Sequence, residues 1–329
     1  MLISILDRSR TRVGEPDGAA LRHSIDRAVR AESLGFHRFW AAEHHAVPGI
    51  ASGSPAVLLA AAGARTDTIR LGSGGVMLPH HQPLVVAEQF LMLASLHPGR
   101  IDLGLGRSLG FTRPVRRALR QETAKEDAFT ADVAEVRALL AGTGEVTARP
   151  AVPAAHLPAV HLLATGRGVA LAASLGLPLV VGGPVLQKSG IAEVLAAYRR
   201  DFTPAADGDA PRVMVSLDVY PADTTAEARD LALPEAYAMA RTRETGDFGP
   251  LEEIGTVRDR LRTGEISART RDRIESSLAT TVLGTHAEVS SRLDEILTRT
   301  GADEVMVSTS TTDIRTLADL DRTLVDILH

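Results

Sequence analysis

The sequence predicts a closed (β/α)8 barrel, the TIM-barrel fold, as a single domain over residues 1–329. Two observations favour this fold. Short apolar runs alternate with longer segments of helical periodicity, and eight such pairs fit within 329 residues. The runs are also apolar throughout, as expected of strands in a parallel sheet that is buried on both faces. The same alternation allows an open, doubly wound sheet, which is the alternative fold.

The expected strands are short apolar runs bounded by turn residues. They lie at residues 2–6, 36–42, 69–78, 101–105, 160–164, 179–181, 213–219 and 304–308. Helices are expected between them, where apolar residues recur every three or four positions. They lie at residues 17–34, 54–64, 84–96, 127–140, 169–175, 191–200 and 227–243, with a closing helix to 328. Gly35 is a suitable C-terminal cap for the first helix, and Ser54 with Pro55 begins the second.

Two connections exceed the minimal βα unit. Residues 106–127 form an arginine-rich insertion after the fourth strand, and residues 246–277 form a polar insertion after the seventh strand and its helix. Long loops of this kind are commonly functional. We expect the second insertion to be a mobile lid that closes over the site.

The composition excludes several classes of function. The chain has no cysteine, which excludes disulfides, iron–sulfur clusters, thiolate zinc sites and cysteine nucleophiles. Aromatic residues make up 3% and the net charge is −5, which argues against a nucleic-acid partner. The apolar N-terminal run is too short for a signal peptide or a membrane span. We therefore expect a cytoplasmic protein with no membrane contact.

The chemistry of a (β/α)8 barrel lies at the C-terminal ends of its strands. The segments that follow the second to sixth strands are rich in glycine, histidine, arginine and hydroxyl groups. They are residues 42–45, 72–81, 104–108, 164–168 and 182–184. Small walls, a few imidazoles and two guanidinium groups suit a large, flat, anionic ligand better than a small metal-bound substrate.

Four histidines occur at these strand ends. Successive strand residues point to opposite faces, so His44 and His45 do not both face one ligand in a regular strand. We assign the functional role to His44 and leave His45 open between a functional and a structural role. His80 and His81 precede a helix and are open between the site and a solvated loop. With Glu43 they could supply metal ligands, but no His-x-His or His-Glu-x-x-His spacing occurs, so we expect no metal.

Two segments favour phosphate binding. Arg107 follows Gly-Leu-Gly at a strand end, and arginine is well suited to phosphate. The alternative for Arg107 is a surface ion pair with Asp102 or Glu122. A loop between the fifth strand and its helix offers free amides, although it could equally be an ordinary βα loop. Its residues are Thr165, Gly166, Arg167 and Gly168.

Glycines inside the third expected strand are a further signal. Gly72, Gly74 and Gly75 fall within residues 69–78. Glycine weakens a strand, so it usually marks a bulge or the close approach of a ligand.

Several blocks of the sequence resemble the luciferase-like flavin-dependent monooxygenases. The most specific are RFWAAEHH at 38–45, LGSGGVMLP at 71–79 and HPGRIDLGLGR at 97–107. Residues 174–178 and 301–307 resemble later blocks, so that the resemblance spans about residues 2–328. The likeness is to the single-chain bacterial subgroup of the family rather than to light-emitting luciferase.

This resemblance implies a barrel that binds reduced FMN, delivered by a separate flavin reductase. Dioxygen would then form a flavin C4a-hydroperoxide that oxygenates a small or medium-sized organic molecule, with epoxidation or hydroxylation of an aromatic polyketide as one case. The family also implies a homodimer that pairs through the second and third helices. Two alternatives stay open: a hydride-transfer enzyme that uses the deazaflavin F420, and a flavin-binding protein without catalysis.

The resemblance also implies residue roles. His44 would be the catalytic imidazole, and Gly74–Gly75 would be a non-proline cis peptide under the isoalloxazine ring. The phosphate would be held by Arg107, Thr165, Gly166, Arg167 and Gly168. The serine-rich phosphate loop of the family is replaced here by residues 164–168, and Gly106 stands where luciferase has a reactive cysteine. Residues 182–184 (GGP) would widen the pocket for a bulky substrate.

Overall fold

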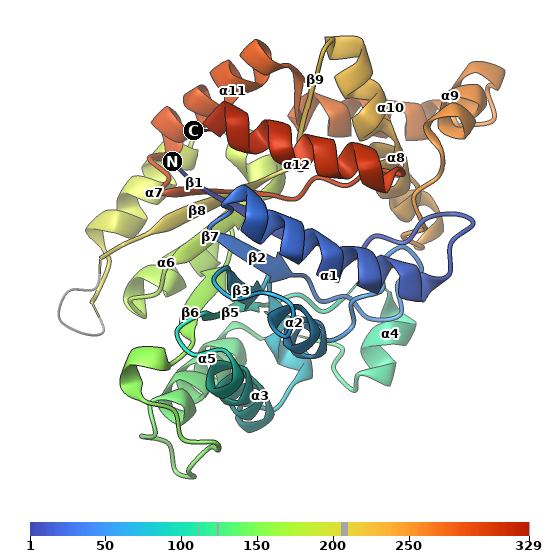
Figure 1. The fold of residues 1–329 in the computed structure, drawn as a ribbon. Helices are drawn as coiled ribbons and strands as arrows, with labels where there is room; N and C mark the ends of the chain where they lie inside the picture. The colour runs from blue at the N-terminus through green and yellow to red at the C-terminus, as the bar shows by residue number, and fades with distance from the viewer. Residues whose placement is uncertain (111, 124, 205–209, 329) are drawn as a thin grey trace.

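The computed structural model describes residues 1–110, 112–123, 125–204 and 210–328. Its parallel strands form one sheet in the order β3-β2-β1-β11-β8-β7-β6-β5-β4, and β3 also pairs with β5 (Figure 1). This last pairing closes the sheet into a barrel. The (β/α)8 prediction is therefore confirmed, and the open doubly wound alternative is excluded.

The strands of the barrel match the predicted apolar runs to within two residues at each end. They are β1 (Leu2–Asp7), β2 (Arg38–Ala41), β3 (Arg70–Ser73), β4 (Val76–Met77), β5 (Ile101–Gly106), β6 (Ala159–Leu163), β7 (Leu179–Gly182), β8 (Val213–Leu217) and β11 (Glu304–Val307). β3 and β4 are two parts of one predicted strand, separated by Gly74 and Gly75. Taken together as one, they make the barrel eight-stranded.

Helices surround the barrel and cover its outer face (Figure 1). They are α1 (Asp17–Leu34), α2 (Pro55–Gly63), α3 (Pro83–Leu96), α5 (Glu126–Leu140), α6 (Arg167–Ser174), α7 (Ile191–Arg200), α11 (His286–Thr300) and α12 (Ile314–Leu328). Three short 3-10 turns, η1 (Leu78–His80), η2 (Ala154–His156) and η3 (Gly183–Gln187), lie in the connections. The bounds of α1 are those predicted, and Gly35 ends it in the left-handed region at φ +83°.

Two apolar layers stabilise the barrel. The larger one lies between the strands and the surrounding helices. The second fills the interior of the barrel with Trp40, Val180, Met214 and Met306. Trp40 is fully buried and its indole N–H donates to Asp102 at 3.1 Å. The interior is thus a packed core, and the site must lie at an end of the barrel.

The insertion after the seventh strand of the barrel is larger than predicted. It runs from β9 (Val219–Ala222) to β10 (Val282–Thr285), which pair as a separate two-stranded sheet, and it contains α8 (Thr225–Thr245), α9 (Ile254–Thr263) and α10 (Ala268–Thr280). The predicted helix at 227–243 is α8, but α8 packs on α10, β9 and β10 instead of joining the ring. The ring position belongs to α11, which contacts α7 and α12 and was not predicted.

The expectation of a polar loop at 246–277 is wrong, because most of this segment is helical. Apolar side chains of α8, α9 and α10 share a small core of their own that includes Val257, Ile274 and Leu278. The start of the segment also pairs with the loop between β1 and α1, since the Leu251 N–H donates to the Thr11 carbonyl at 2.9 Å and the Val13 N–H donates to the Leu251 carbonyl at 3.0 Å. The role of a mobile lid stays a prediction.

The predicted insertion after the fourth strand, residues 106–127, is confirmed as a long connection. It contains the short helix α4 (Arg113–Ala118), and its residues 111 and 124 lie outside the described part of the chain. Within the described residues, no helix has the length and apolarity that crossing a lipid bilayer requires. The single domain over residues 1–329 stays a prediction.

Candidate active site

The strand register brings the predicted site segments to one edge of the barrel. Ala41 at the end of β2 pairs with Ser73 of β3, and Gly106 at the end of β5 pairs with Leu163 of β6. All these strands are parallel. The residues that follow them therefore leave the barrel at the same C-terminal edge, as predicted.

Gly74 and Gly75, which we call the glycine step, connect β3 to β4 at this edge. The peptide bond between Gly74 and Gly75 is cis, as the family resemblance implies. A Cβ atom on Gly74 would lie 2.2 Å from Leu6 Cδ1, and one on Gly75 would lie 2.8 Å from the Gly104 carbonyl oxygen. The backbone of Gly104 thus requires glycine at position 75, whereas at position 74 the end of the Leu6 side chain would have to move aside. The glycine pattern predicts a bulge or the close approach of a ligand, and the structure shows protein neighbours at both glycines.

His44 lies directly beyond β2, where its backbone N–H donates to the Ser52 carbonyl at 2.9 Å. Its side chain is largely buried. Burial and, secondly, the positive charge of Arg8 lower the pKa of His44 from 6.5 to about 4. The imidazole is therefore neutral at pH 7, where it can act as a base or as a hydrogen-bond donor.

The His45 side chain is bound by a neighbouring carboxylate. Its Nε2 donates to Glu43 Oε1 at 2.6 Å, and His81 Nε2 donates to the same oxygen at 2.6 Å. Glu43 Oε2 accepts the Met77 backbone N–H at 3.1 Å. Burial raises the pKa of Glu43, but these hydrogen bonds outweigh burial and bring the pKa to about 2. The buried carboxylate thus joins the end of β2 to β4 and η1. His45 and His81 are thus both held by Glu43, and the functional role of His45 stays an open prediction.

The same three residues are the metal candidate at this edge. One ligand atom from each of Glu43, His45 and His81 lies within 4.8 Å of the others. Two ligands about 2.1 Å from a tetrahedral metal would be about 3.4 Å apart. Both histidine nitrogens instead lie at hydrogen-bond distance, 2.6 Å, from a single oxygen. This geometry is that of a hydrogen-bonded cluster, and the absence of a metal stays a prediction.

Arg107 has a different ion-pair partner from the two considered in the sequence analysis. Its Nη1 lies 3.2 Å from Glu126 Oε2, and both side chains are well exposed. Asp102 is fully buried and pairs with Arg38 and Arg70, and Glu122 pairs with Arg113. A partly open arginine at this edge remains available to an anion.

The loop before α6 supplies further donors. Gly166 has φ +57° and precedes the helix, and Thr165, Gly166 and Arg167 are exposed. The Gly168 N–H bonds to the Thr165 carbonyl at 3.2 Å, so its amide is partly engaged within the loop. Together with Arg107 on the neighbouring strand, the loop offers guanidinium, hydroxyl and amide donors. Such a set suits the phosphate monoester of FMN.

A cavity of about 290 Å³ opens at the C-terminal ends of β1, β7 and β8, and His44, Arg107 and Thr165 are not among the described residues that line it. Leu6 lines it and also lies against Gly74, so the Leu6 side chain lies between the cavity and Gly74. Its charged residues, Arg8, Asp218 and Glu235, were missed by the sequence analysis. Arg8 follows the first strand and Asp218 falls within the predicted strand over 213–219, so neither belongs to the predicted strand-end segments. The signal that could have found both is a charge directly after a buried apolar run.

Known proteins are similar to this chain in sequence and in fold. The family model described as luciferase-like monooxygenase matches residues 1–304. A luciferase-like monooxygenase of Escherichia coli strain K12 is 36% identical over 314 residues, which are 93% of this chain and 90% of that protein. The crystal structure of apo-MsnO8 superposes with a TM-score of 0.87 at 31% identity, covering 99% of this chain and 98% of that one.

A more distant structure shares the fold alone. It is an F420-dependent secondary alcohol dehydrogenase in complex with an F420-acetone adduct, with 16% identity, a TM-score of 0.66 and coverage of 100% of this chain and 99% of that one. The family model matches most of the chain, and the Escherichia coli relative is similar over nearly its whole length. The chain therefore belongs to the luciferase-like monooxygenase family of enzymes.

Proposed function

We propose that the chain binds reduced FMN and uses dioxygen to oxygenate a small or medium-sized organic substrate. One observation carries the proposal. The cis Gly74–Gly75 step, the neutral His44 and the donors Arg107 and Thr165 all follow neighbouring strands at one edge of one closed barrel. Reduced FMN, when bound, supplies the electrons that activate dioxygen.

The residues divide the work between binding and proton handling. Arg107, Thr165 and Arg167, with the amides of Gly166 and Gly168, would hold the phosphate by charge-assisted hydrogen bonds. His44 would take a proton from a reacting group, or donate a hydrogen bond to it, because it is neutral at pH 7. The nearby charge of Arg8 helps to keep His44 neutral.

We also propose that a separate reductase, met transiently, delivers the flavin in the cytoplasm. The one glycine-rich run that approaches a dinucleotide fingerprint, at residues 104–110, has the wrong spacing for it. The chain would therefore depend on another protein for nicotinamide oxidation. An aromatic polyketide as substrate stays a prediction.

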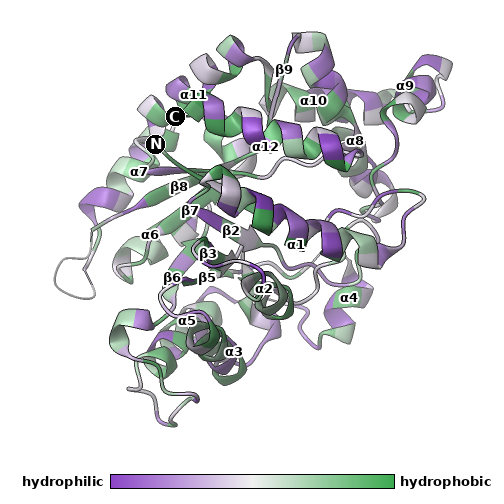
Figure 2. Cartoon of the chain, viewed as in Figure 1, coloured by the Kyte–Doolittle hydropathy of each residue, from purple (hydrophilic) through white to green (hydrophobic). Residues whose placement is uncertain are grey.

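A homodimer is proposed on an apolar surface, which we call the α2–α3 face. Its exposed members are Val57, Val85, Met92 and Leu96, with 70%, 44%, 55% and 64% of their surface accessible. α2 and α3 contact each other, and both are coloured as strongly hydrophobic in Figure 2. Several exposed large apolar side chains on adjoining helices are typical of an interface. The face agrees with the predicted pairing through the second and third helices.

The cofactor is tested by titrating the protein with reduced and oxidised FMN and with F420, following fluorescence. We expect FMN to bind at least tenfold more tightly than F420. Oxygen consumption and product formation are then measured with a flavin reductase and candidate substrates, in wild type and in His44→Ala. Tighter F420 binding would replace the proposal by hydride transfer. FMN binding with no substrate-dependent turnover would instead favour the flavin-binding alternative.

A further inference from the structure

The cavity beside the glycine step has an unusual balance of polar groups. It lies at the C-terminal ends of β1, β7 and β8, and α8 and α10 cover it. Its apolar wall is formed by Leu6, Pro184, Leu217, Ala232, Ala236 and Met239. Its size is at the lower end of the range for small-molecule sites. A mainly apolar molecule with a few polar groups would suit such a space.

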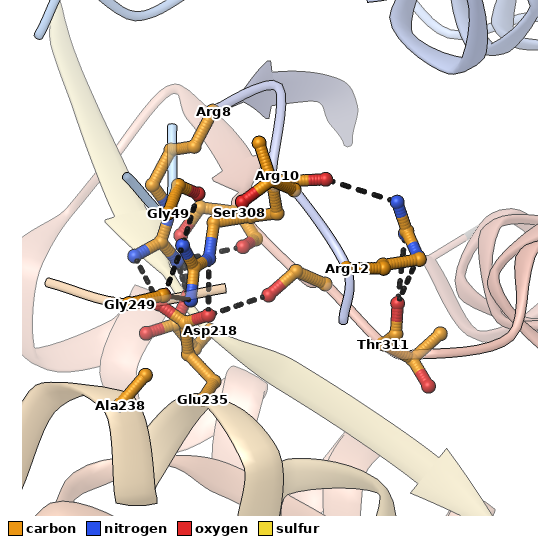
Figure 3. A network of polar contacts seen from close by, with 12 residues as sticks. Arg8, Arg10, Arg12, Gly49, Asp218, Glu235, Ala238, Gly249, Ser308 and Thr311 are labelled. Carbon is orange, nitrogen blue, oxygen red and sulfur yellow. Dashed lines mark hydrogen bonds and ion pairs between the residues drawn. The ribbon is translucent and has the colours of Figure 1, made fainter. Parts of the chain in front are cut away.

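Among the described residues that line the cavity, Arg8 is the only cation, and its guanidinium is already bound within the protein. Arg8 Nη1 donates to Glu235 Oε1 at 3.0 Å, and Nη2 donates to the Ser308 carbonyl at 2.8 Å and to Asp218 Oδ1 (Figure 3). Its Nε is buried. The guanidinium therefore has no free fork for an incoming carboxylate.

Glu235 is held in its charged form. Burial raises the pKa of Glu235, but the positive charges of Arg10 and Arg8 outweigh burial and set the pKa at about 2. Arg10 Nε donates to Glu235 Oε2 at 2.8 Å, and Ser310 Oγ donates to the same oxygen at 2.9 Å. Both oxygens of Glu235 are thus satisfied, and the lining of the cavity carries one positive and two negative charges.

Asp218 is the carboxylate that remains open to a ligand. Both hydrogen bonds that it accepts from the described residues reach Oδ1, one from Arg8 and one from Ser308 Oγ at 2.7 Å. Its side chain is 33% exposed, and it lines the cavity. The second oxygen, Oδ2, therefore offers an anionic acceptor.

The hydroxyl groups of the lining add to the acceptors. Thr280 and Thr281 donate to the Ser277 carbonyl at 2.9 and 3.0 Å, and Tyr220 donates to the Ser310 carbonyl at 2.9 Å. Each hydroxyl has a single proton, so what these groups can still offer a ligand is lone pairs. Ser216 and Ser277 also line the cavity, and their hydroxyls donate no hydrogen bond within the described residues, so they are the side-chain hydroxyl donors that a ligand could use.

We propose that this cavity selects a neutral or cationic substrate whose apolar body carries a donor group, a hydroxyl or an amine, which Asp218 Oδ2 accepts. The cavity discriminates against carboxylate substrates, because its lining carries one positive and two negative charges, and the positive group, Arg8, is already paired with Asp218 and Glu235. This assignment of a substrate class rests on the proposed function of the neighbouring flavin site.

The test uses three naphthalenes that differ in one substituent: aminomethyl, hydroxymethyl and carboxylate. Their binding to the wild-type protein is measured by calorimetry. We expect the amine and the alcohol to bind at least tenfold more tightly than the carboxylate. Equal affinities, or a preference for the carboxylate, would overturn the proposal. This comparison uses only the wild-type protein, so it tests the proposed substrate class even if a substituted protein fails to fold.

Asp218→Asn locates the effect. It keeps the shape of the side chain and removes its charge, so we expect the preference for the amine over the carboxylate to fall at least tenfold. Asp223→Asn, an exposed aspartate outside the cavity, is the matched control and should keep the wild-type preference. An unchanged preference in a folded Asp218→Asn protein would also contradict the assignment.

Failure of this inference is separable from failure of the proposed function. The FMN affinity of the wild-type protein is measured in parallel. A protein that binds FMN but shows no charge preference refutes the substrate class alone. A protein that shows the preference but does not bind FMN refutes the flavin function and leaves the cavity assignment intact.

Discussion

Arg107 Nη1 lies 3.2 Å from Glu126 Oε2, so the arginine proposed to bind phosphate is paired with a carboxylate at the start of α5. Both side chains are about 40% exposed. Exposed ion pairs of this kind contribute only about 0.2–1 kcal/mol. A phosphate dianion can therefore displace Glu126 at little cost.

This pair predicts two opposite effects on FMN affinity. Arg107→Ala should weaken FMN binding about tenfold or more, which corresponds to about 1.4 kcal/mol. Glu126→Gln should strengthen it several-fold, because the competing carboxylate charge is removed. Fluorescence titration measures both effects.

Riboflavin, which lacks the phosphate, is the matched ligand, and neither variant should change its affinity. Arg113→Ala is the matched variant, since Arg113 is an exposed arginine of the same insertion paired with Glu122. Equal losses of FMN and riboflavin affinity in Arg107→Ala would refute the phosphate role.

The second prediction concerns the ionisation of His44. Its pKa in the folded protein is about 4 and lies below the ordinary value of 6.5. The unfolded chain therefore binds more protons between these values. The free energy of unfolding therefore has its full value above pH 6.5 and falls as the pH falls from 6.5 toward 4.

An NMR titration of the imidazole protons, assigned with His44→Gln, should show a midpoint near pH 4. The free energy of urea unfolding should fall less steeply between pH 6.5 and 4 in His44→Gln than in wild type, by up to about 3 kcal/mol. A midpoint near 6.5 would contradict the desolvated, Arg8-facing environment.

The third prediction concerns Glu43, whose charge holds two histidines and the Met77 amide. Glu43→Gln leaves at least one of these buried donors poorly satisfied. We expect the free energy of unfolding to fall by about 1–3 kcal/mol, measured by urea denaturation at pH 7.

Glu145→Gln provides the comparison, because Glu145 is exposed and its substitution should change stability by no more than about 0.5 kcal/mol. Equal stability of the two variants would show that the cluster does not hold β2 to β4. Zinc or iron bound stoichiometrically to the purified wild-type protein would show that the cluster is a metal site.

The fourth prediction separates two glycines of β5. A Cβ atom on Gly104 would lie 2.1 Å from the Ser73 carbonyl oxygen, a backbone atom that cannot move aside. A Cβ atom on Gly106 would lie 3.8 Å from its nearest neighbour, the Val76 carbonyl oxygen. Gly104→Ala should therefore destabilise the protein by about 3 kcal/mol or more, whereas Gly106→Ala should melt close to wild type. Equal melting temperatures of the two variants would contradict the close packing of Gly104 against Ser73.

The fifth prediction tests the α2–α3 face. Val57→Asp and Leu96→Glu place charges on its most exposed apolar residues. We expect light scattering to give the mass of a dimer for wild type and of a monomer for the double variant. Val146→Asp changes an equally apolar, 52% exposed residue outside the face and should stay dimeric. A monomeric wild-type protein would refute the dimer.

Local sequence patterns determined the barrel and most of its boundaries. Apolar runs mark strands buried on both faces, and the spacing of apolar residues marks α1, with Gly35 marking its C-terminal end. The same rule for strand ends indicated His44, Gly74, Arg107 and Thr165. These features depend on neighbours in sequence, so they can be read without the fold.

Only the tertiary structure decided which partner each polar group has. Glu43 binds His81, which is 38 positions away, and Asp218 binds Arg8 across 210 positions. Periodicity also could not show that α8 packs within the insertion while α11 joins the ring, because both helices have buried apolar residues. Apolar burial follows from local pattern, whereas the pairing of charges depends on which distant strand ends the closed barrel brings together.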